Sequence, residues 1–371
     1  VGQPAAVANS LKWERVGTLD FGVDARILDN HIGFTFDWYQ RNTDGMIQPT
    51  SVPATFGTGG PNINAGNFRT RGYEVSIDAN YTVGRDIQLY GSIGLADYKT
   101  IFTKWSNPSL SIATTQNYKG KTYGEIWGFQ TDRYFTSSDD TAQIRASQGK
   151  LTSGGSFNYG PGDIKYKDLN HDGVVNGGNS TLYNHGDLKV IGNNQPRYTY
   201  NFRLGGSWKG FDLDVFFQGV GKRNWWATGQ TALPLWQSVD ILYKNQLDFW
   251  TPDHTNAKYP RPYPGNSGGT VAGLSPGGNN FYPQSKYLLN LAYLRLKNLT
   301  VGYAVTNPVL TRAGITKLRF YFSGQNLFTF SHVGVPFDPE ITDGYTTGGI
   351  SYTGRTYPFD KSFSAGMQLS F

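Results

Sequence analysis

The sequence contains no cysteine and only two methionines among its 371 residues. Without thiols, the chain can form neither a disulfide-stapled scaffold nor a zinc–thiolate site. It also lacks any apolar run near the roughly 18 residues that a membrane-spanning helix needs, and its mean hydropathy is −0.45. The composition therefore excludes a helical membrane protein. It does not exclude a transmembrane β-barrel, whose strands are only half apolar.

Basic runs are missing as well. The formal net charge is +6, but lysine and arginine are scattered along the chain and no recognition helix is apparent. A solvated surface accounts for such charges better than a nucleic-acid interface does. The five histidines show no metal-ligand spacing. We therefore expect no nucleic-acid partner.

Glycine and aromatic residues are abundant instead. There are 47 Gly, 18 Pro, 24 Tyr, 23 Phe and 9 Trp. This composition favours many strands joined by many turns. A chain of this length forms one large all-β domain or two ordinary domains.

The last eleven residues show the clearest strand pattern. Every second residue from Phe363 to Phe371 is apolar, and the residues between them, from Ser362 to Ser370, are small or polar. This period of two predicts a strand with one apolar face and one polar face. Such a strand fits a transmembrane β-barrel, where the apolar face meets lipid. The alternative is the last strand of a β-sandwich, in which the same alternation buries one face in a core.

Similar alternation recurs at residues 19–27, 32–38, 73–81, 87–95, 198–208, 211–217, 289–304 and 317–330. Its polar positions include Asp37, Glu74, Asp78, Asp212 and Asp214. Carboxylates on one face cannot lie in a protein core without a partner for each, but they can line water. By parity we expect these five to form a hydrated lumen wall.

The connections between these strands alternate in length. Those at 28–31, 82–86, 209–210 and 305–316 are short, whereas those at 48–64, 103–196, 223–288 and 331–360 are long. Because antiparallel strands alternate in direction, all the short turns meet at one end of the sheet and all the long loops at the other. Short periplasmic turns and long extracellular loops are typical of outer-membrane barrels. Local structure is expected within the first large loop, at residues 124–135 and 164–167.

We therefore predict an all-β, antiparallel transmembrane β-barrel, with 103–196 and 223–288 as long extracellular loops. The pattern gives about nine strands, and single-chain bacterial barrels need an even number. The sequence starts at Val1 almost directly in a strand, without a signal segment. We interpret residues 1–371 as the C-terminal portion of a larger barrel.

Several motifs carry a resemblance to a known family. They are Asn9-Ser-Leu-Lys-Trp-Glu14, Arg71-Gly-Tyr-Glu74, Gly162-Asp-Ile-Lys-Tyr-Lys-Asp-Leu-Asn-His-Asp-Gly173, Ile191-Gly-Asn-Asn-Gln-Pro-Arg-Tyr-Thr-Tyr200, Trp208-Lys-Gly-Phe-Asp-Leu-Asp-Val-Phe-Phe-Gln-Gly219, Tyr293-Leu-Arg-Leu-Lys-Asn-Leu299, Ser323-Gly-Gln-Asn-Leu327 and the terminal strand. In this order, from about residue 9 to 371, they resemble the C-terminal barrel of SusC/RagA-type TonB-dependent outer-membrane transporters of Bacteroidetes.

The resemblance implies a barrel of about 22 strands around an N-terminal plug. The plug would be opened by TonB from the periplasm, and a SusD-like surface lipoprotein would cover the barrel as a lid. The cargo would be oligosaccharides or peptides, and the protein would lie in the bacterial outer membrane in contact with lipid. The resemblance is also compatible with a dimer of this two-protein complex. The plug domain and the TonB-contacting segment are absent from this sequence, so TonB would act through a missing N-terminal part.

Residues 168–179 resemble the start of a calcium-binding loop. Oxygen ligands at alternate positions can wrap one ion, and Gly173 allows the sharp turn. The candidate ligands are Asp168, Asn170, Asp172, the Val174 carbonyl and Asn176. Asn179 stands where a bidentate Glu is wanted, so Asp163 or Asp187 would have to supply the missing charge. The other interpretation is an Asx-rich turn stabilised by its own side chains, without Ca²⁺.

Aromatic residues gather in the second large loop. The candidates for substrate or lid contact are Trp225, Trp226, Trp236, Trp250 and Tyr259. Aromatic faces stack on sugar rings and anchor protein interfaces. The competing interpretations are internal packing of the loop and an interfacial aromatic girdle. We rank packing and lid contact above direct substrate contact.

No constellation of residues predicts an enzyme. We predict TonB-dependent import of oligosaccharides or peptides together with a SusD-like lid. The alternative is a non-transporting surface protein, such as an adhesin or a glycan-binding β-domain that uses the aromatic loops. A secreted glycoside hydrolase comes third, because it would need two carboxylates on facing walls at catalytic separation.

Overall fold

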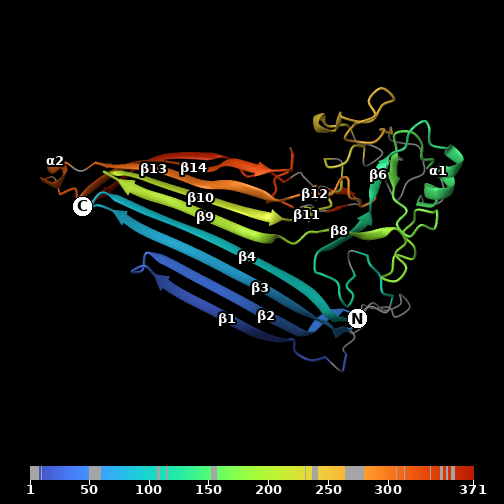
Figure 1. Cartoon of the computed structure of the whole chain (residues 1–371), viewed down its shortest axis with the longest axis horizontal. Helices are drawn as coiled ribbons and strands as arrows, with labels where there is room; N and C mark the ends of the chain where they lie inside the picture. The colour runs from blue at the N-terminus through green and yellow to red at the C-terminus, as the bar shows by residue number, and fades with distance from the viewer. Residues whose placement is uncertain are drawn as a thin grey trace, which may run out of the picture.

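A computed structural model describes residues 8–9, 11–49, 60–106, 109–113, 116–151, 157–229, 231–235, 241–263, 280–305, 307–312, 314–334, 336–342, 346–347, 350–351 and 356–371. Its main feature is a nine-stranded antiparallel sheet in which neighbours in sequence are neighbours in space (Figure 1). The strands are β1 (Arg15–Ile27), β2 (Ile32–Pro49), β3 (Asn62–Val83), β4 (Ile87–Trp105), β9 (Arg197–Trp208), β10 (Phe211–Lys222), β13 (Tyr293–Val305), β14 (Lys317–Ser331) and β17 (Ser362–Ser370).

The short connections all lie at one end of this sheet, as the alternation of lengths requires. Lys209 and Gly210 join β9 to β10, with φ values of 47° and 90°. Two consecutive positive φ values give the tight turn whose twist matches the flanking strands. The helix α2 (Pro308–Arg312) occupies the connection between β13 and β14. In Figure 1 these turns lie on the left, at the same end as the C-terminus.

The described residues of two of the long connections, within 106–196 and 223–292, fold together at the opposite end and are called the loop domain here. Its elements are β5 (Glu125–Phe129), β6 (Thr131–Tyr134), α1 (Thr141–Gln148), η2 (Gly149–Leu151), β7 (Ile164–Tyr166), β8 (Leu188–Asn193), β11 (Asn224–Trp225), η4 (Lys244–Gln246) and β12 (Leu289–Asn290). The pairs β5–β8, β6–β7 and β11–β12 form two-stranded sheets. β5, β6 and β7 lie within the ranges 124–135 and 164–167, where local structure is expected. A further short pair, β15 (Thr346–Thr347) and β16 (Ile350–Ser351), follows β14.

The bounds of the strands differ slightly from those expected. β4 continues to Trp105, past the expected start of the first large loop at residue 103. At the end of the second loop, β12 has only two residues and β13 begins at Tyr293. Strand ends are set by pairing with a neighbour, which the alternation of one strand does not reveal.

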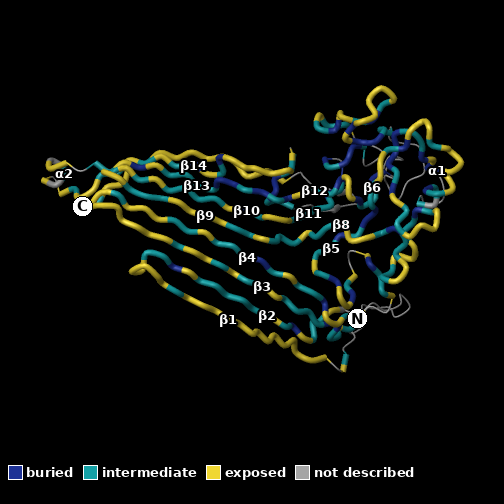
Figure 2. The backbone as a smooth tube through the Cα atoms, viewed as in Figure 1, coloured by how far each residue is buried: buried dark blue, intermediate teal, exposed yellow. Residues whose placement is uncertain are grey.

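Most of the buried core lies in the loop domain rather than in the sheet. One cluster contains Phe129, Ile164, Tyr166, Val175, Leu233, Tyr259, Phe281 and Tyr287. A second contains Phe135, Ile144, Phe157 and Tyr159. Figure 2 shows the contrast, with buried residues concentrated in the loop domain and exposed residues along the strands.

None of the helices in the described part of the chain has the length and apolar character that crossing a membrane requires.

The described part of the chain is mostly β, and its main sheet is antiparallel as predicted, with the short helices α1 and α2 in the connections. Within the described chain the sheet runs from β1 to β17 without closing on itself. A closed barrel, and the number of strands in it, therefore stay predictions.

Candidate functional site

One face of the sheet is apolar from strand to strand. The register places in one row across neighbouring strands Phe34, Ile77, Ile93, Phe202 and Phe217. On the same face Phe21 is 69% exposed and Phe363 is 63% exposed. Soluble monomers rarely expose a contiguous apolar surface of this extent. This face is therefore suited to contact with an apolar environment rather than with water.

The apolar face ends at a defined position on β3, on the side away from the short turns. On β3 it spans Tyr73 to Tyr81, and two residues earlier the same face carries Arg71, opposite Gln40 and Lys99 on the adjoining strands. The Arg71 Nε donates to Gln40 Oε1 at 2.7 Å. A tilted strand crosses a bilayer in about 9–11 residues. The apolar segment of β3 has that length.

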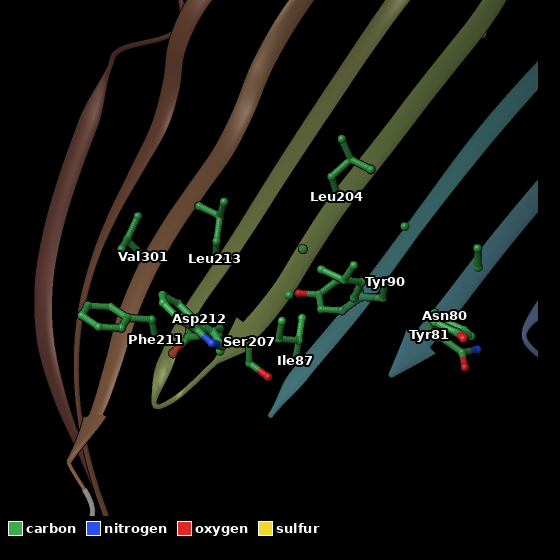
Figure 3. Close-up of a pocket in the computed structure, with 16 residues that line it drawn as sticks. Asn80, Tyr81, Ile87, Tyr90, Leu204, Ser207, Phe211, Asp212, Leu213 and Val301 are labelled. Atoms are coloured by element: carbon green, nitrogen blue, oxygen red, sulfur yellow. The ribbon is translucent and has the colours of Figure 1, made fainter. Parts of the chain in front are cut away.

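A depression of about 690 Å³ interrupts the apolar face near the short turns (Figure 3). Leu204, Leu213 and Val301 line it, and Gly206 lies opposite Leu213 in the register. The Leu89 side chain and the Gln88 carbonyl occupy the space that a Cβ atom at Gly206 would need, so this glycine allows the neighbouring strand to approach closely. The lining is almost entirely apolar, so the depression belongs to the apolar face and offers little to a polar cargo.

The opposite face of the sheet is polar, and Asp37, Glu74, Asp78, Asp212 and Asp214 all lie on it, as parity predicts. Several of these carboxylates are paired there with arginines. Arg26 lies 2.8 Å from Asp78, Arg203 lies 2.6 Å from Asp214, and Arg319 Nε donates to Asp212 at 2.8 Å.

A shallow cavity of about 450 Å³ opens on this polar face. Asp37, Glu74, Ser76, Asn201 and Gln218 contribute to its lining. Carboxylates, hydroxyls and amides on one surface are stable where water reaches them. The face therefore has the character of a hydrated wall.

The predicted calcium loop is closed by its own hydrogen bonds. Asp168 accepts from the backbone N–H of His171 at 2.6 Å and of Gly173 at 2.8 Å. Asn170 Nδ2 donates to Asp172 Oδ2 at 3.0 Å, and the Asp172 N–H donates to Asn170 Oδ1 at 3.0 Å. His171 and Gly173 both have positive φ, which bends the chain tightly. These are the bonds of an Asx-rich turn.

Of the two residues proposed to supply the missing charge, Asp187 reaches the loop. Its carboxylate is fully buried and accepts from the N–H groups of Leu169 at 2.6 Å and of Asn176 at 2.8 Å. Asn176 Nδ2 donates to the Val174 carbonyl at 3.0 Å. The described residues contain no group of three or more His, Cys, Asp or Glu side chains arranged to hold a metal ion. Calcium in the 168–179 loop stays a prediction.

Asp163 instead anchors the interior of the loop domain. It accepts from the Tyr263 hydroxyl at 2.8 Å and from Asn280 Nδ2 at 2.8 Å, and Arg261 Nη2 lies 3.4 Å away. Burial raises the pKa of this carboxyl, while the surrounding donors oppose the rise. The contacts join segments about a hundred residues apart, so Asp163 has a structural role.

The predicted aromatic contacts fall into two groups. Trp250 and Tyr259 are only 8% and 4% exposed. The backbone N–H of Trp250 donates to the backbone carbonyl of Tyr259 at 2.9 Å, and the Tyr259 ring stacks on Tyr287 with centroids 5.6 Å apart. Both are packing residues of the loop domain, the role ranked above direct substrate contact. Trp236 lies outside the described residues.

Trp225 and Trp226 line a cavity of about 370 Å³, called the junction cavity here. It lies where the loop domain joins the sheet, and Trp127, Asn194 and Gln195 also line it. Composition had singled out the two tryptophans of the second loop. Composition did not single out Trp127, Asn194 and Gln195. These residues come from the first loop, on β5 and just after β8, far from the second loop in the sequence.

A buried ionic cluster also escaped the sequence analysis. Arg295 on β13 is 2% exposed, and its Nη2 donates to both oxygens of Asp338 at 2.8 Å. Its Nη1 lies 2.7 Å from Glu340, which also pairs with Lys297 at 2.6 Å. Phe337, next to Asp338, contacts the Trp225 ring edge-on at 5.8 Å. The cluster therefore fixes the segment 336–342 against the sheet beside the junction cavity.

Comparison with known proteins agrees with this geometry. The chain is 26% identical over 383 residues to TonB-dependent receptor P3 of Formosa agariphila, a match that covers 98% of the chain and 35% of that protein. It is 23% identical over 395 residues to TonB-dependent receptor SusC of Bacteroides thetaiotaomicron, with 100% of the chain and 33% of SusC covered.

A solved structure of the RagAB peptide transporter superposes on the whole chain with a TM-score of 0.71 at 20% identity, covering 36% of the RagAB chain. The chain is SusC/RagA-like. No protein-family model matches it. This SusC/RagA-like chain spans about a third of the length of the curated relatives that it matches.

Proposed function

We propose that this SusC/RagA-like chain forms part of the wall and the external face of a TonB-dependent importer in the bacterial outer membrane. The observation that carries the proposal is the two-faced sheet, apolar on one side and lined with carboxylates on the other, with short turns at one end and large loops at the other. The apolar face would contact lipid, the polar face would line the lumen, and the loop domain would lie outside the cell.

The energy for import would come from TonB, acting on a plug in another part of the polypeptide. A SusD-like surface lipoprotein would cover the loop domain as a lid, and the complex of the two proteins would form a dimer. The cargo would be oligosaccharides or peptides too large to diffuse across the membrane. The matches to TonB-dependent receptors, SusC among them, and to RagAB cover nearly the whole of this chain and about a third of those proteins, and they support import as the function.

The proposed orientation can be tested by cysteine labelling, because residues 1–371 contain no native cysteine. Tyr183 in the loop domain is 83% exposed, and Asp86 lies in the turn between β3 and β4. The single variants Tyr183→Cys and Asp86→Cys are introduced into the complete polypeptide that contains this sequence. It is expressed in cells and carries no other cysteine. A membrane-impermeant maleimide should label Tyr183→Cys on intact cells.

Asp86→Cys should react with the same reagent only after the outer membrane is permeabilised. Equal labelling of both positions on intact cells would rule out a sheet that crosses the membrane. Labelling in the expected order, without any uptake of oligosaccharide or peptide, would favour the alternative of a non-transporting surface protein that binds glycans.

A further inference from the structure

The junction cavity brings together aromatic rings from distant parts of the chain. Trp127 comes from β5, and Trp225 and Trp226 come from the region of β11. β5 pairs with β8 through Glu125 and Asn193, and the Asn193 N–H donates to Asn224 Oδ1 at 3.4 Å. The cavity, of about 370 Å³, is within the size range of small-molecule sites.

Amide groups form the polar edge of this cavity. Gln195 Nε2 donates to Asn194 Oδ1 at 2.8 Å. A primary amide has two donor hydrogens and an acceptor oxygen with two lone pairs, so this bond uses only part of the capacity of each side chain. The pair can still donate to and accept from a ligand that carries hydroxyl groups.

The two charged side chains of the cavity, Lys121 and Glu125, are held in its walls. Lys121 is 3% exposed, and its Nζ donates to the Gln116 carbonyl at 2.6 Å. Glu125 accepts from the Tyr118 hydroxyl at 2.7 Å and from the Thr122 N–H at 2.7 Å. Because Lys121 is buried in the wall and both oxygens of Glu125 accept hydrogen bonds, a charged ligand would lose water here without meeting an exposed counter-charge, which is unfavourable.

We propose that the junction cavity is a binding subsite for a neutral saccharide unit, with its apolar ring face on the tryptophans and its hydroxyl groups on the amides of Asn194 and Gln195. This inference rests on the proposed function, because it makes oligosaccharide rather than peptide the cargo of the importer. A sugar ring offers both an apolar C–H face and a hydroxyl edge, which matches the two kinds of lining. Charged peptide termini and side chains match neither.

The test uses the cell-made polypeptide containing this sequence, purified in detergent and applied to an array of neutral oligosaccharides, acidic oligosaccharides and peptides. We expect binding to at least one neutral oligosaccharide. Its Kd, measured by calorimetry, should rise roughly tenfold in Trp225→Ala, through loss of ring contact. A smaller rise is expected in Asn194→Ala, whose exposed side chain can be shortened with little risk to folding.

The matched control is Tyr183→Ala, an aromatic truncation in the loop domain away from the cavity, which should leave the Kd unchanged. The inference fails if only peptides or acidic saccharides bind, or if both cavity variants bind a neutral oligosaccharide like the unaltered protein. TonB-dependent uptake of peptides would then leave the proposed function standing. Neutral saccharide binding with the expected variant pattern but no TonB-dependent uptake would instead contradict import and keep the subsite.

Discussion

Arg295 gains its role from residues far away along the chain. Asp338 and Glu340 lie more than forty positions later, in a segment with no regular structure of its own. Nothing in the local pattern around Arg295 distinguishes it from the other arginines of the polar face, because ion pairing between distant segments leaves no periodic trace in the sequence. For the same reason, the sequence pattern does not predict the hydrogen bond from Asn280 to Asp163.

Removing Arg295 should release the segment 336–342 from the sheet. In Arg295→Met, the buried Asp338 would lose its charged partner, which costs about 3–5 kcal/mol in comparable buried pairs. Limited proteolysis of the detergent-purified polypeptide should therefore cut this segment much faster than in the unaltered protein. The measurement is the rate of appearance of fragments that end within residues 336–342.

Arg203→Met is the matched control, since Arg203 is 53% exposed in its pair with Asp214. Exposed pairs contribute only about 0–1 kcal/mol. Equal cleavage rates for the two variants would contradict the assignment of the Arg295 cluster as the anchor of this segment.

At the scale of the element, the strands follow from the sequence far better than the loop domain does. A period of two over Tyr73–Tyr81 or over the terminal strand states which residues share a face, and the turn at Lys209 and Gly210 fixes where two strands meet. By contrast, the burial of Trp250 and Tyr259 depends on packing between segments that sequence patterns do not connect. The sequence predicted only part of the lining of the junction cavity. Aromatic residues such as Trp225 and Trp226 stand out in the composition, whereas amides such as Asn194 and Gln195 do not.

The loop 168–179 yields a prediction at this scale. If calcium joins Asp168, Asn170, Asp172 and the buried Asp187, millimolar Ca²⁺ should protect the loop domain from unfolding, by about 2.7 kcal/mol at a hundred times Kd. Protection is measured by proteolysis of the loop domain during heating, with calcium or with a chelator. The variant Asp172→Asn, which weakens the ligand set without changing its shape, should lose the calcium effect. Identical protection with calcium and with chelator would leave the self-bonded Asx turn as the whole explanation.

At the scale of the whole molecule, the length of the strands separates two environments. β3 has 22 residues, which extend over about 70 Å at 3.3 Å per residue, while the apolar band of an outer-membrane barrel is about 25 Å tall. The apolar alternation ends near Tyr73, so the part of β3 before Tyr73 would project beyond the lipid, at the end of the sheet where β4, β9, β10 and β13 connect to the loop domain. The sequence could predict this division from alternation alone, but not the number of strands that complete a barrel.

The central claim is that this chain serves TonB-dependent import across the outer membrane. The most direct test compares uptake of fluorescent oligosaccharides and peptides by cells that make the polypeptide containing this sequence, with and without functional TonB. The account predicts that at least one labelled solute enters the periplasm only when both the polypeptide and TonB are present. Uptake that is the same without TonB, or the same without the polypeptide, would contradict it.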